Sequence, residues 1–215
     1  MKLTKRLQAI ADLVGDVSKI YDVGCDHAYL DIYLASKGIK CVAIDVRNQI
    51  VKFAQKNVDE SGYQDKIDVV LNNGLNGFKV DKEELVIMSG LGTRTILDII
   101  KNQPVNRLII QSNDNLFLLR KNMMNQNYYI SDEKIVFEDN KYYVIIKFES
   151  GFKEYTDYEL LLGPKLLHQN TDVFTQYLRS MLSHYRDVLL AVPANYLERR
   201  IAIEQIIKYI EMALR

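Results

Sequence analysis

The sequence predicts an α/β fold in which a mostly parallel, seven-stranded sheet ends in an antiparallel hairpin and is followed by a C-terminal helical hairpin. Three observations support this prediction. Short apolar runs alternate with segments of helical periodicity over the first two thirds of the chain, which is the pattern of right-handed βαβ units. Two further strand-like runs then follow each other with no helix between them. Beyond Gly151 the apolar residues keep helical spacing alone.

The first expected element is a short amphipathic helix, because Leu3, Leu7, Ile10 and Val14 recur at helical spacing. Strands and helices then alternate, and the first helix of this alternation ends at Gly38. The strands are expected over residues 19–24, 40–44, 67–71, 84–88 and 107–111 and, as the hairpin, over residues 128–136 and 142–148. The helices are expected over residues 28–37, 47–60, 93–101 and 115–125.

The last part of the chain reads as a helical hairpin. Helical spacing runs over residues 174–189 and 203–214, with Pro193 between the two runs. A short helix before them is expected to end near Gly163-Pro164. We therefore expect two domains, at residues 1–150 and 151–215, the second being helical and coiled-coil-like.

Composition limits the class of protein. The chain has 215 residues, 48% of them hydrophobic and 26% charged, which is ordinary for a globular protein. Its formal net charge of zero favours neither a nucleic acid nor an acidic partner, so any basic surface must be local. No long apolar run is present, so we expect no membrane span. Cys25 and Cys41 lack metal-ligand spacing, which argues against structural zinc and for a reducing cytoplasm.

The most informative segment is residues 20–30, which reads as a strand, a turn at Gly24 and the start of a helix. Asp45 follows the next strand. A glycine turn after a first strand and an acid after the second are the layout of a site for a nucleoside cofactor. The usual dinucleotide fingerprint is absent, because Asp26 and His27 stand where further glycines would be.

Polar and glycine-rich loops follow five of the expected strands. They cover residues 24–29, 45–48, 72–76, 89–93 and 111–115. Ligands of open α/β sheets bind at the carboxyl ends of the strands. Turn formation alone would explain each loop singly, but it explains all five together poorly. The sequence therefore predicts one ligand site at this edge.

Several positions in these loops have two interpretations. Asp45 is either a carboxylate for two ribose hydroxyls or the N-cap of the next helix. Asn73 either pairs with an adenine edge or is a turn residue. Gly90 and Gly92 either allow close approach of a ligand or only turn the chain. His27 is either functional or a structural histidine at a helix start.

Metal binding is not expected, because His168 and His184 lie in the helical appendage with no ligand spacing. The sequence also contains no nucleophile-elbow, P-loop or zinc-protease motif.

The chain resembles the class I, S-adenosylmethionine-dependent methyltransferases, which have a Rossmann-like fold. More narrowly, it is similar to the bacterial tRNA adenine-N1-methyltransferases that act on position 22 in the D-arm. The elements that carry this resemblance are residues 3–7, 22–30, 73–75, 89–92 and 108–113, and the resemblance covers nearly the whole chain. Three positions depart from the family pattern: Asn73 replaces an acid, Thr93 replaces a second glycine and Asp45 replaces a glutamate.

The resemblance implies transfer of a methyl group from S-adenosylmethionine to N1 of an adenine in tRNA. The catalytic candidates are Asp26, His27 and Asn113. The cofactor-binding candidates are Asp22, Gly24, Asp26, His27, Asp45, Val46, Asn73, Gly74, Leu75, Ser89 and Gly90. The substrate-binding candidates are Tyr29, Gln111, Asn113, Lys2, Lys5, Arg6, Arg199 and Arg200. Asn73 is expected to lower cofactor affinity, because an amide offers a donor as well as an acceptor.

Each candidate has an expected role. Asp26 would stabilise the positive charge that develops on the adenine, and His27 would orient the base or relay a proton. Tyr29 would stack on the base, while Gln111 and Asn113 would read its polar edge. Since N1 lies on the Watson–Crick edge, the base must leave its pair to react.

Docking of tRNA would use phosphate contacts from the lysines and arginines among the candidates, although each of them singly could be part of a solvated helix face. We expect a cytoplasmic monomer that binds tRNA and neither a membrane nor a metal. Two alternatives remain open at this point. The chain could methylate a small molecule or a protein, with the helical appendage as a lid or dimer surface, or it could be a non-catalytic interaction module.

Overall fold

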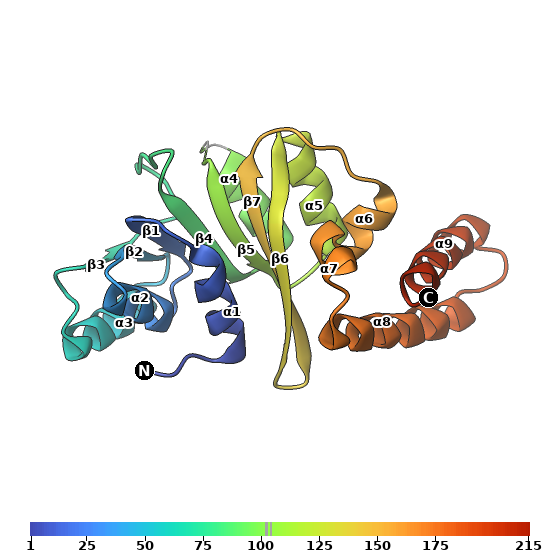
Figure 1. The fold of residues 1–215 in the computed structure, drawn as a ribbon, viewed down its shortest axis with the longest axis horizontal. Helices are drawn as coiled ribbons and strands as arrows, with labels where there is room; N and C mark the ends of the chain where they lie inside the picture. Colours follow the sequence, from blue (N-terminus) through green and yellow to red (C-terminus); the bar gives the residue numbers. More distant parts are fainter. Residues whose placement is uncertain (102, 104) are drawn as a thin grey trace. The chain divides into compact units, whose positions relative to one another are not determined.

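The computed structural model describes residues 1–101, 103 and 105–215 (Figure 1). Contacts within the chain divide it into two compact units, Met1–Glu154 and Tyr155–Arg215. The division lies a few residues beyond the domain boundary that we expect from the sequence. Each unit is described separately.

The first unit contains a seven-stranded sheet with the order β3-β2-β1-β4-β5-β7-β6. Strands β1 to β5 are parallel, and β7 pairs antiparallel with both β5 and β6. The predicted fold class is therefore confirmed. The strands are β1 (Lys19–Val23), β2 (Lys40–Asp45), β3 (Ile67–Leu71), β4 (Leu85–Leu91), β5 (Arg107–Ser112), β6 (Tyr128–Glu138) and β7 (Lys141–Ser150).

Five helices accompany the sheet in the described part of this unit. They are α1 (Lys5–Val14), α2 (Tyr29–Ser36), α3 (Asn48–Ser61), α4 (Thr93–Lys101) and α5 (Leu116–Asn125). Helices α1, α2 and α3 form one contacting row, and α4 contacts α5. The apolar residues of that row pack with the inner strands into a single buried cluster, as the helical spacing predicts. Helix α1 begins after Thr4, whose side chain accepts a hydrogen bond from the Leu7 N–H, so Leu3 lies outside it.

Strand β4 extends further than the sequence predicts. Ser89, Gly90 and Leu91 belong to this strand, where we expect a loop. The pairing of β4 with β5 continues across a bulge between Ser89 and Leu91. Gly90 lies in the bulge with φ of +78°, a conformation that glycine adopts without strain.

The hairpin of β6 and β7 is also longer than expected. Its turn consists of Asp139 and Asn140, and both have positive φ angles, +47° and +58°. Two central residues of this kind form the two-residue turn whose twist matches that of the flanking strands. Only the two central residues of the segment 138–141 therefore form the turn. Its outer residues, Glu138 and Lys141, pair with each other at the ends of the two strands.

The second unit is helical, with α6 (Asp157–Leu162), α7 (Pro164–Gln169), α8 (Asp172–Ala191) and α9 (Leu197–Ala213). Helix α6 ends at Gly163, as predicted, but Pro164 then begins α7, since proline is favoured at the first position of a helix. Helices α8 and α9 form the expected hairpin, in which Arg200 Nη1 donates to the Leu189 and Val192 carbonyls at 3.1 and 2.8 Å. In the described residues, no helix is both long and apolar enough to cross a membrane.

Candidate active site

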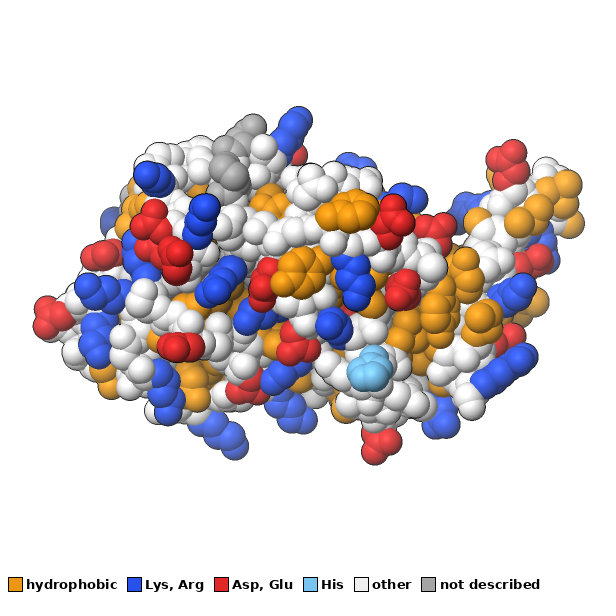
Figure 2. Space-filling view, turned by 45° about the horizontal axis from the view of Figure 1, so that its top comes forward, with side chains coloured by type: hydrophobic (Ala, Val, Ile, Leu, Met, Phe, Trp, Pro, Cys, Tyr) orange, Lys and Arg blue, Asp and Glu red, His pale blue; other side chains and the backbone are white. Residues whose placement is uncertain are grey.

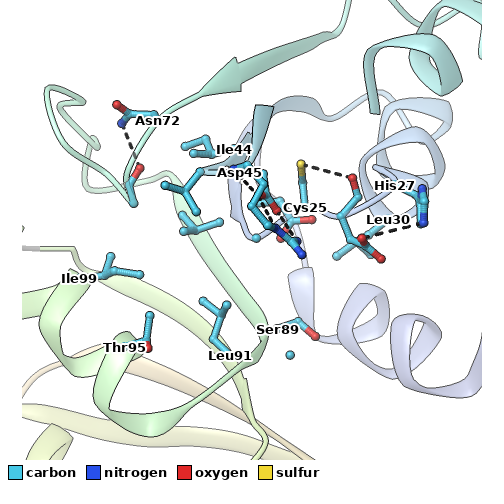
Figure 3. Close-up of a pocket in the computed structure, with 18 of the residues that line it drawn as sticks. Cys25, His27, Leu30, Ile44, Asp45, Asn72, Ser89, Leu91, Thr95 and Ile99 are labelled. Carbon is cyan, nitrogen blue, oxygen red and sulfur yellow. Dashed lines mark hydrogen bonds and ion pairs between the residues drawn. The ribbon is translucent and has the colours of Figure 1, made fainter. Parts of the chain in front are cut away.

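A pocket of about 520 Å³ opens at the carboxyl ends of β1, β2 and β4 (Figure 3). It brings together most of the candidates that the sequence predicts. Those that line it are Arg6, Asp22, Gly24, Asp26, His27, Tyr29, Asp45, Val46, Asn73, Gly74, Ser89 and Gly90. The convergence follows from topology, because parallel strands deliver all of their carboxyl ends to one edge of the sheet.

The floor of the pocket is the turn after β1. Gly24 has φ of +86°, and its N–H and that of Cys25 both donate to the Ile44 carbonyl, at 2.8 and 3.1 Å. A Cβ atom at Gly24 would lie 3.3 Å from Leu91 Cδ2. Asp26 and Ala28 also have positive φ angles, +51° and +57°. Such strain in non-glycine residues concentrates at ligand-binding turns.

Asp45 is buried at the end of β2 and forms a close ion pair. Its Oδ1 accepts from the Arg47 N–H and Nε at 2.9 and 3.0 Å, and its Oδ2 accepts from Nη2 at 3.0 Å. Burial raises the pKa of Asp45, but the Arg47 bonds outweigh burial and leave the pKa below its usual value. Arg47, not Asp45, occupies the N-cap position of α3. The pocket therefore presents an ionised carboxylate that Arg47 covers.

A second acid, Asp31 of α2, lies against Asp22 and is fully buried. Burial raises the pKa of Asp22 to about 7, and burial together with the Asp22 charge raises the pKa of Asp31. In the described structure neither Asp31 oxygen has a donor partner. Because two carboxylates have only lone pairs to offer, the two groups can bond only by sharing a proton. The sequence does not predict a role for Asp31 in the site, because it is a single polar residue within an expected helix.

Asp26 and His27 are more exposed, at the mouth of the pocket. His27 Nε2 lies 4.0 Å from Asp26 Oδ1, and their side chains are 45% and 62% exposed. The His27 ring stacks on Tyr29 at 5.7 Å and meets Phe53 edge to face at 6.3 Å. Phe53 of α3 was not among the candidates. Together these rings form an aromatic wall beside a carboxylate.

The loop after β3 holds its two asparagines differently. Asn72 Nδ2 donates to the Gly74 and Asn76 carbonyls at 3.1 and 2.9 Å, which fixes the loop. Asn73 is exposed and, within the described structure, its amide is left available to a ligand. Leu75, a predicted cofactor contact, is instead buried in the core and does not line this pocket.

Gln111 and Asn113 do not line this pocket themselves, but both bond to Gly90, which does. Gln111 Oε1 accepts from Arg6 Nη1, Ser89 Oγ and the Gly90 N–H at 3.1, 3.2 and 3.1 Å. Gln111 Nε2 donates to Asn113 Oδ1 at 3.1 Å. Asn113 Nδ2 in turn donates to the Gly90 carbonyl at 2.7 Å. The two amides are thus tied to the bulge of β4.

Of the phosphate contacts predicted in the first unit, Arg6 lines the pocket and the two lysines do not. Lys2 and Lys5 are exposed but do not line it, and Arg6 turns inward to Ser89 Oγ at 2.7 Å. Arg199 is exposed on α9, whereas Arg200 caps carbonyls of α8. On the face shown in Figure 2, basic and acidic side chains are interspersed, in keeping with the zero net charge.

Metal-ligating side chains do not gather in this site. Within residues 1–101, 103 and 105–215, no three histidine, cysteine or acidic side chains form a group that could hold a metal ion. Cys25 and Cys41 are both free and buried, and burial raises the pKa of both thiols.

Comparison with known proteins gives consistent results. A family model described as a methyltransferase domain matches residues 3–146. The tRNA (adenine(22)-N(1))-methyltransferase of Bacillus subtilis is 29% identical over 201 residues, which cover 87% of this chain and 84% of that protein.

Two solved structures resemble the chain over its length. Sp1610 of Streptococcus pneumoniae in complex with S-adenosyl-L-methionine superposes with a TM-score of 0.89 at 30% identity, covering 100% of both chains. M. capricolum TrmK in complex with S-adenosyl-homocysteine has a TM-score of 0.88 at 29% identity and covers 99% of both chains. The chain therefore belongs to the methyltransferase domain family and, within it, to the family of bacterial tRNA (adenine-22-N1)-methyltransferases.

Proposed function

We propose that this protein transfers a methyl group from S-adenosylmethionine to N1 of the adenine at position 22 of tRNA. The observation that supports this most directly is the pocket, where a glycine turn, the buried carboxylate of Asp45 and the available amide of Asn73 converge. Relatives of similar length bind this cofactor or its product, and the Bacillus subtilis relative is named for this reaction.

The residues of the pocket fit S-adenosylmethionine. Asp45 would accept hydrogen bonds from the ribose hydroxyls, in place of or shared with Arg47. Asn73 and the exposed Val46 side chain would hold the adenine ring. The methionine part is cationic, and it would lie near the acidic side chain of Asp22. The absence of a side chain at Gly24 leaves room for the backbone to pass beneath the ligand.

The bound cofactor supplies an electrophilic methyl group, and the protein residues organise the acceptor. Adenine N1 attacks with its own lone pair, so no side chain has to remove a proton first. Transfer of the methyl group to N1, with the demethylated cofactor as the leaving group, would leave the positive charge on the adenine. Asp26 stabilises that charge, while the His27–Tyr29 wall holds the base. His27 would take a proton from the exocyclic amine afterwards.

Substrate docking would use exposed cations in both units, among them Lys2, Lys5 and Arg199. We also propose that the enzyme acts in the cytoplasm, as a monomer and without a metal.

The decisive experiment is nucleoside mass spectrometry of unmodified tRNA after incubation with the protein and S-adenosylmethionine. We expect 1-methyladenosine, mapped to position 22 by a stop in reverse transcription. A tRNA with guanosine at that position serves as the matched control and should remain unmodified. Methyl transfer only to small molecules or proteins, or a modified nucleoside elsewhere in the tRNA, would contradict the proposal.

A further inference from the structure

The bulge in β4 breaks the regular ladder between β4 and β5, and two side chains replace the missing bonds. The Gly90 N–H donates to Gln111 Oε1 at 3.1 Å, and the Gly90 carbonyl accepts from Asn113 Nδ2 at 2.7 Å. Since Gly90 lines the pocket, both amides are fixed at the edge of the pocket.

The orientation of both amides is determined by their partners. Arg6 Nη1 and the Gly90 N–H can only donate, so the Gln111 atom that they contact must be its oxygen. Gln111 Nε2 then faces Asn113 and donates at 3.1 Å, so the Asn113 atom that receives this bond must also be its oxygen. Arg6 therefore fixes the polarity of Asn113 through Gln111.

The two amides differ in the hydrogen-bond donors and acceptors that remain unused. Gln111 is 1% exposed; its oxygen accepts three hydrogen bonds and its nitrogen donates to the Ser112 carbonyl and Asn113 Oδ1. Its capacity is filled. Asn113 is exposed. In the described structure, its amide keeps one N–H and one oxygen lone pair for a ligand.

We propose that Asn113 reads the Hoogsteen edge of the target adenine, accepting from the N6 amine and donating to N7, and that Gln111 is a positioning residue. This inference rests on the proposed function. One free donor beside one free acceptor matches the N6/N7 pair. Pairing with the Watson–Crick edge would instead place the Asn113 N–H on N1 and block the atom that has to react. Reading of the Hoogsteen edge leaves N1 open to the methyl group.

The first test changes the substrate, so it does not depend on the folding of a variant. A tRNA with 7-deazaadenosine at the target position keeps N1 and N6 but lacks the N7 acceptor. We expect kcat/KM of the unaltered protein to fall about 10-fold with this tRNA, the scale of one lost base contact. Equal rates on the two tRNAs would overturn the inference. A complete lack of methylation of ordinary tRNA would instead contradict the proposed function.

The second test locates the contact. Asn113→Ala should methylate ordinary tRNA slowly and should lose the preference over the 7-deaza tRNA. Gln111→Glu cannot donate to Asn113, so the Asn113 amide can turn its nitrogen inward, and the preference should again shrink. Asn125→Ala is the matched control, because it removes an exposed amide at the end of α5 that does not line the pocket, and it should retain the full preference. A preference that persists in Asn113→Ala would show that another group contacts N7.

Discussion

At the residue scale, four carboxyl groups lie around one glycine turn in different electrostatic surroundings. Asp45 is buried but held ionised by Arg47. Asp22 and Asp31 are buried beside each other, which favours their protonated forms. Asp26 is exposed at the pocket mouth. Because surroundings decide protonation, residues of one type can bind, share a proton or stabilise charge within a single site.

Asp26 is predicted to act on turnover rather than on cofactor binding. Asp26→Asn removes the charge and keeps a side chain that tolerates the positive φ of this position. We expect kcat to fall by about 10², the scale of a lost electrostatic contribution, with little change in cofactor affinity. Steady-state kinetics and calorimetry measure the two effects. Asp45→Asn should show the opposite pattern, and near-normal turnover of Asp26→Asn would exclude Asp26 from the reaction.

The Asp22–Asp31 pair predicts a pH-dependent stability. Burial raises the pKa of Asp22 from 3.8 to about 7, so the folded state keeps a proton that the unfolded state has released. The associated stability is full below about pH 4 and is lost as the pH rises toward 7. Asp31→Asn supplies an N–H donor to Asp22. It should raise the free energy of unfolding at pH 8 by on the order of 1–2 kcal/mol.

Urea denaturation at pH 5 and pH 8 measures this effect. The exposed Asp16→Asn should leave the difference between the two conditions unchanged. An identical pH dependence in Asp31→Asn and the unaltered protein would rule out a shared proton.

At the element scale, the site is built from interruptions of regular structure. The turn after β1 passes through three residues with positive φ, namely Gly24, Asp26 and Ala28. Strand β4 carries its bulge at Gly90, where side chains replace ladder bonds. Regular strands would satisfy their own backbone groups, whereas these interruptions bring backbone and side-chain groups to the pocket.

The turn after β1 can be tested with a pair of glycine substitutions. Gly24→Ala and Gly38→Ala both place a side chain at positive φ, +86° and +94°, so each should cost about 1–2 kcal/mol of stability. The new Cβ lies 3.3 Å from Leu91 at Gly24, but meets nothing within 4 Å at Gly38. Only Gly24→Ala should also weaken cofactor binding, by about tenfold or more, when both are titrated with S-adenosylmethionine. Equal affinity in the two variants would contradict a cofactor-binding role for the turn.

At the scale of the whole molecule, the chain joins a unit with the proposed cofactor site to a helical unit of different character. Charges of both signs are interspersed on the displayed face (Figure 2), and the net charge is zero. A net charge of zero favours recognition of tRNA through a few local phosphate contacts rather than through a broad basic field. Arg199 and Arg200 are adjacent in the sequence but differ in their surroundings. Arg199 is exposed, whereas Arg200 donates hydrogen bonds to two carbonyls at the end of α8.

Arg199→Ala should weaken tRNA binding without affecting stability, because Arg199 is exposed. The slope of the logarithm of the binding constant against the logarithm of salt concentration should become shallower by about 0.7–0.9. Arg200→Ala should instead lower stability by about 1–3 kcal/mol, since two carbonyls of the α8–α9 hairpin lose their donor. Filter binding at several salt concentrations and thermal denaturation separate the two. Unchanged tRNA affinity in Arg199→Ala would argue against docking through α9.

The sequence by itself determined the element order, the antiparallel end of the sheet and the edge at which the site lies. Periodicity shows which face of a helix or strand is buried. Glycines and polar loops show where strands end, and parallel strands end at one edge. Gly24, Asp26 and Asp45 could therefore be assigned to one pocket before any contact was visible.

The tertiary structure alone decided which side chains meet. Arg6 lies 83 positions from Ser89 and 105 from Gln111, and the fold brings the three together at the bulge of β4. Asp31 of α2 could be recognised as the partner of Asp22 only from the packing of this helix against the sheet, where it contacts β2. Periodicity reports burial, but hydrogen-bond partners depend on strand register, bulges and helix placement, which are set by packing over the whole unit.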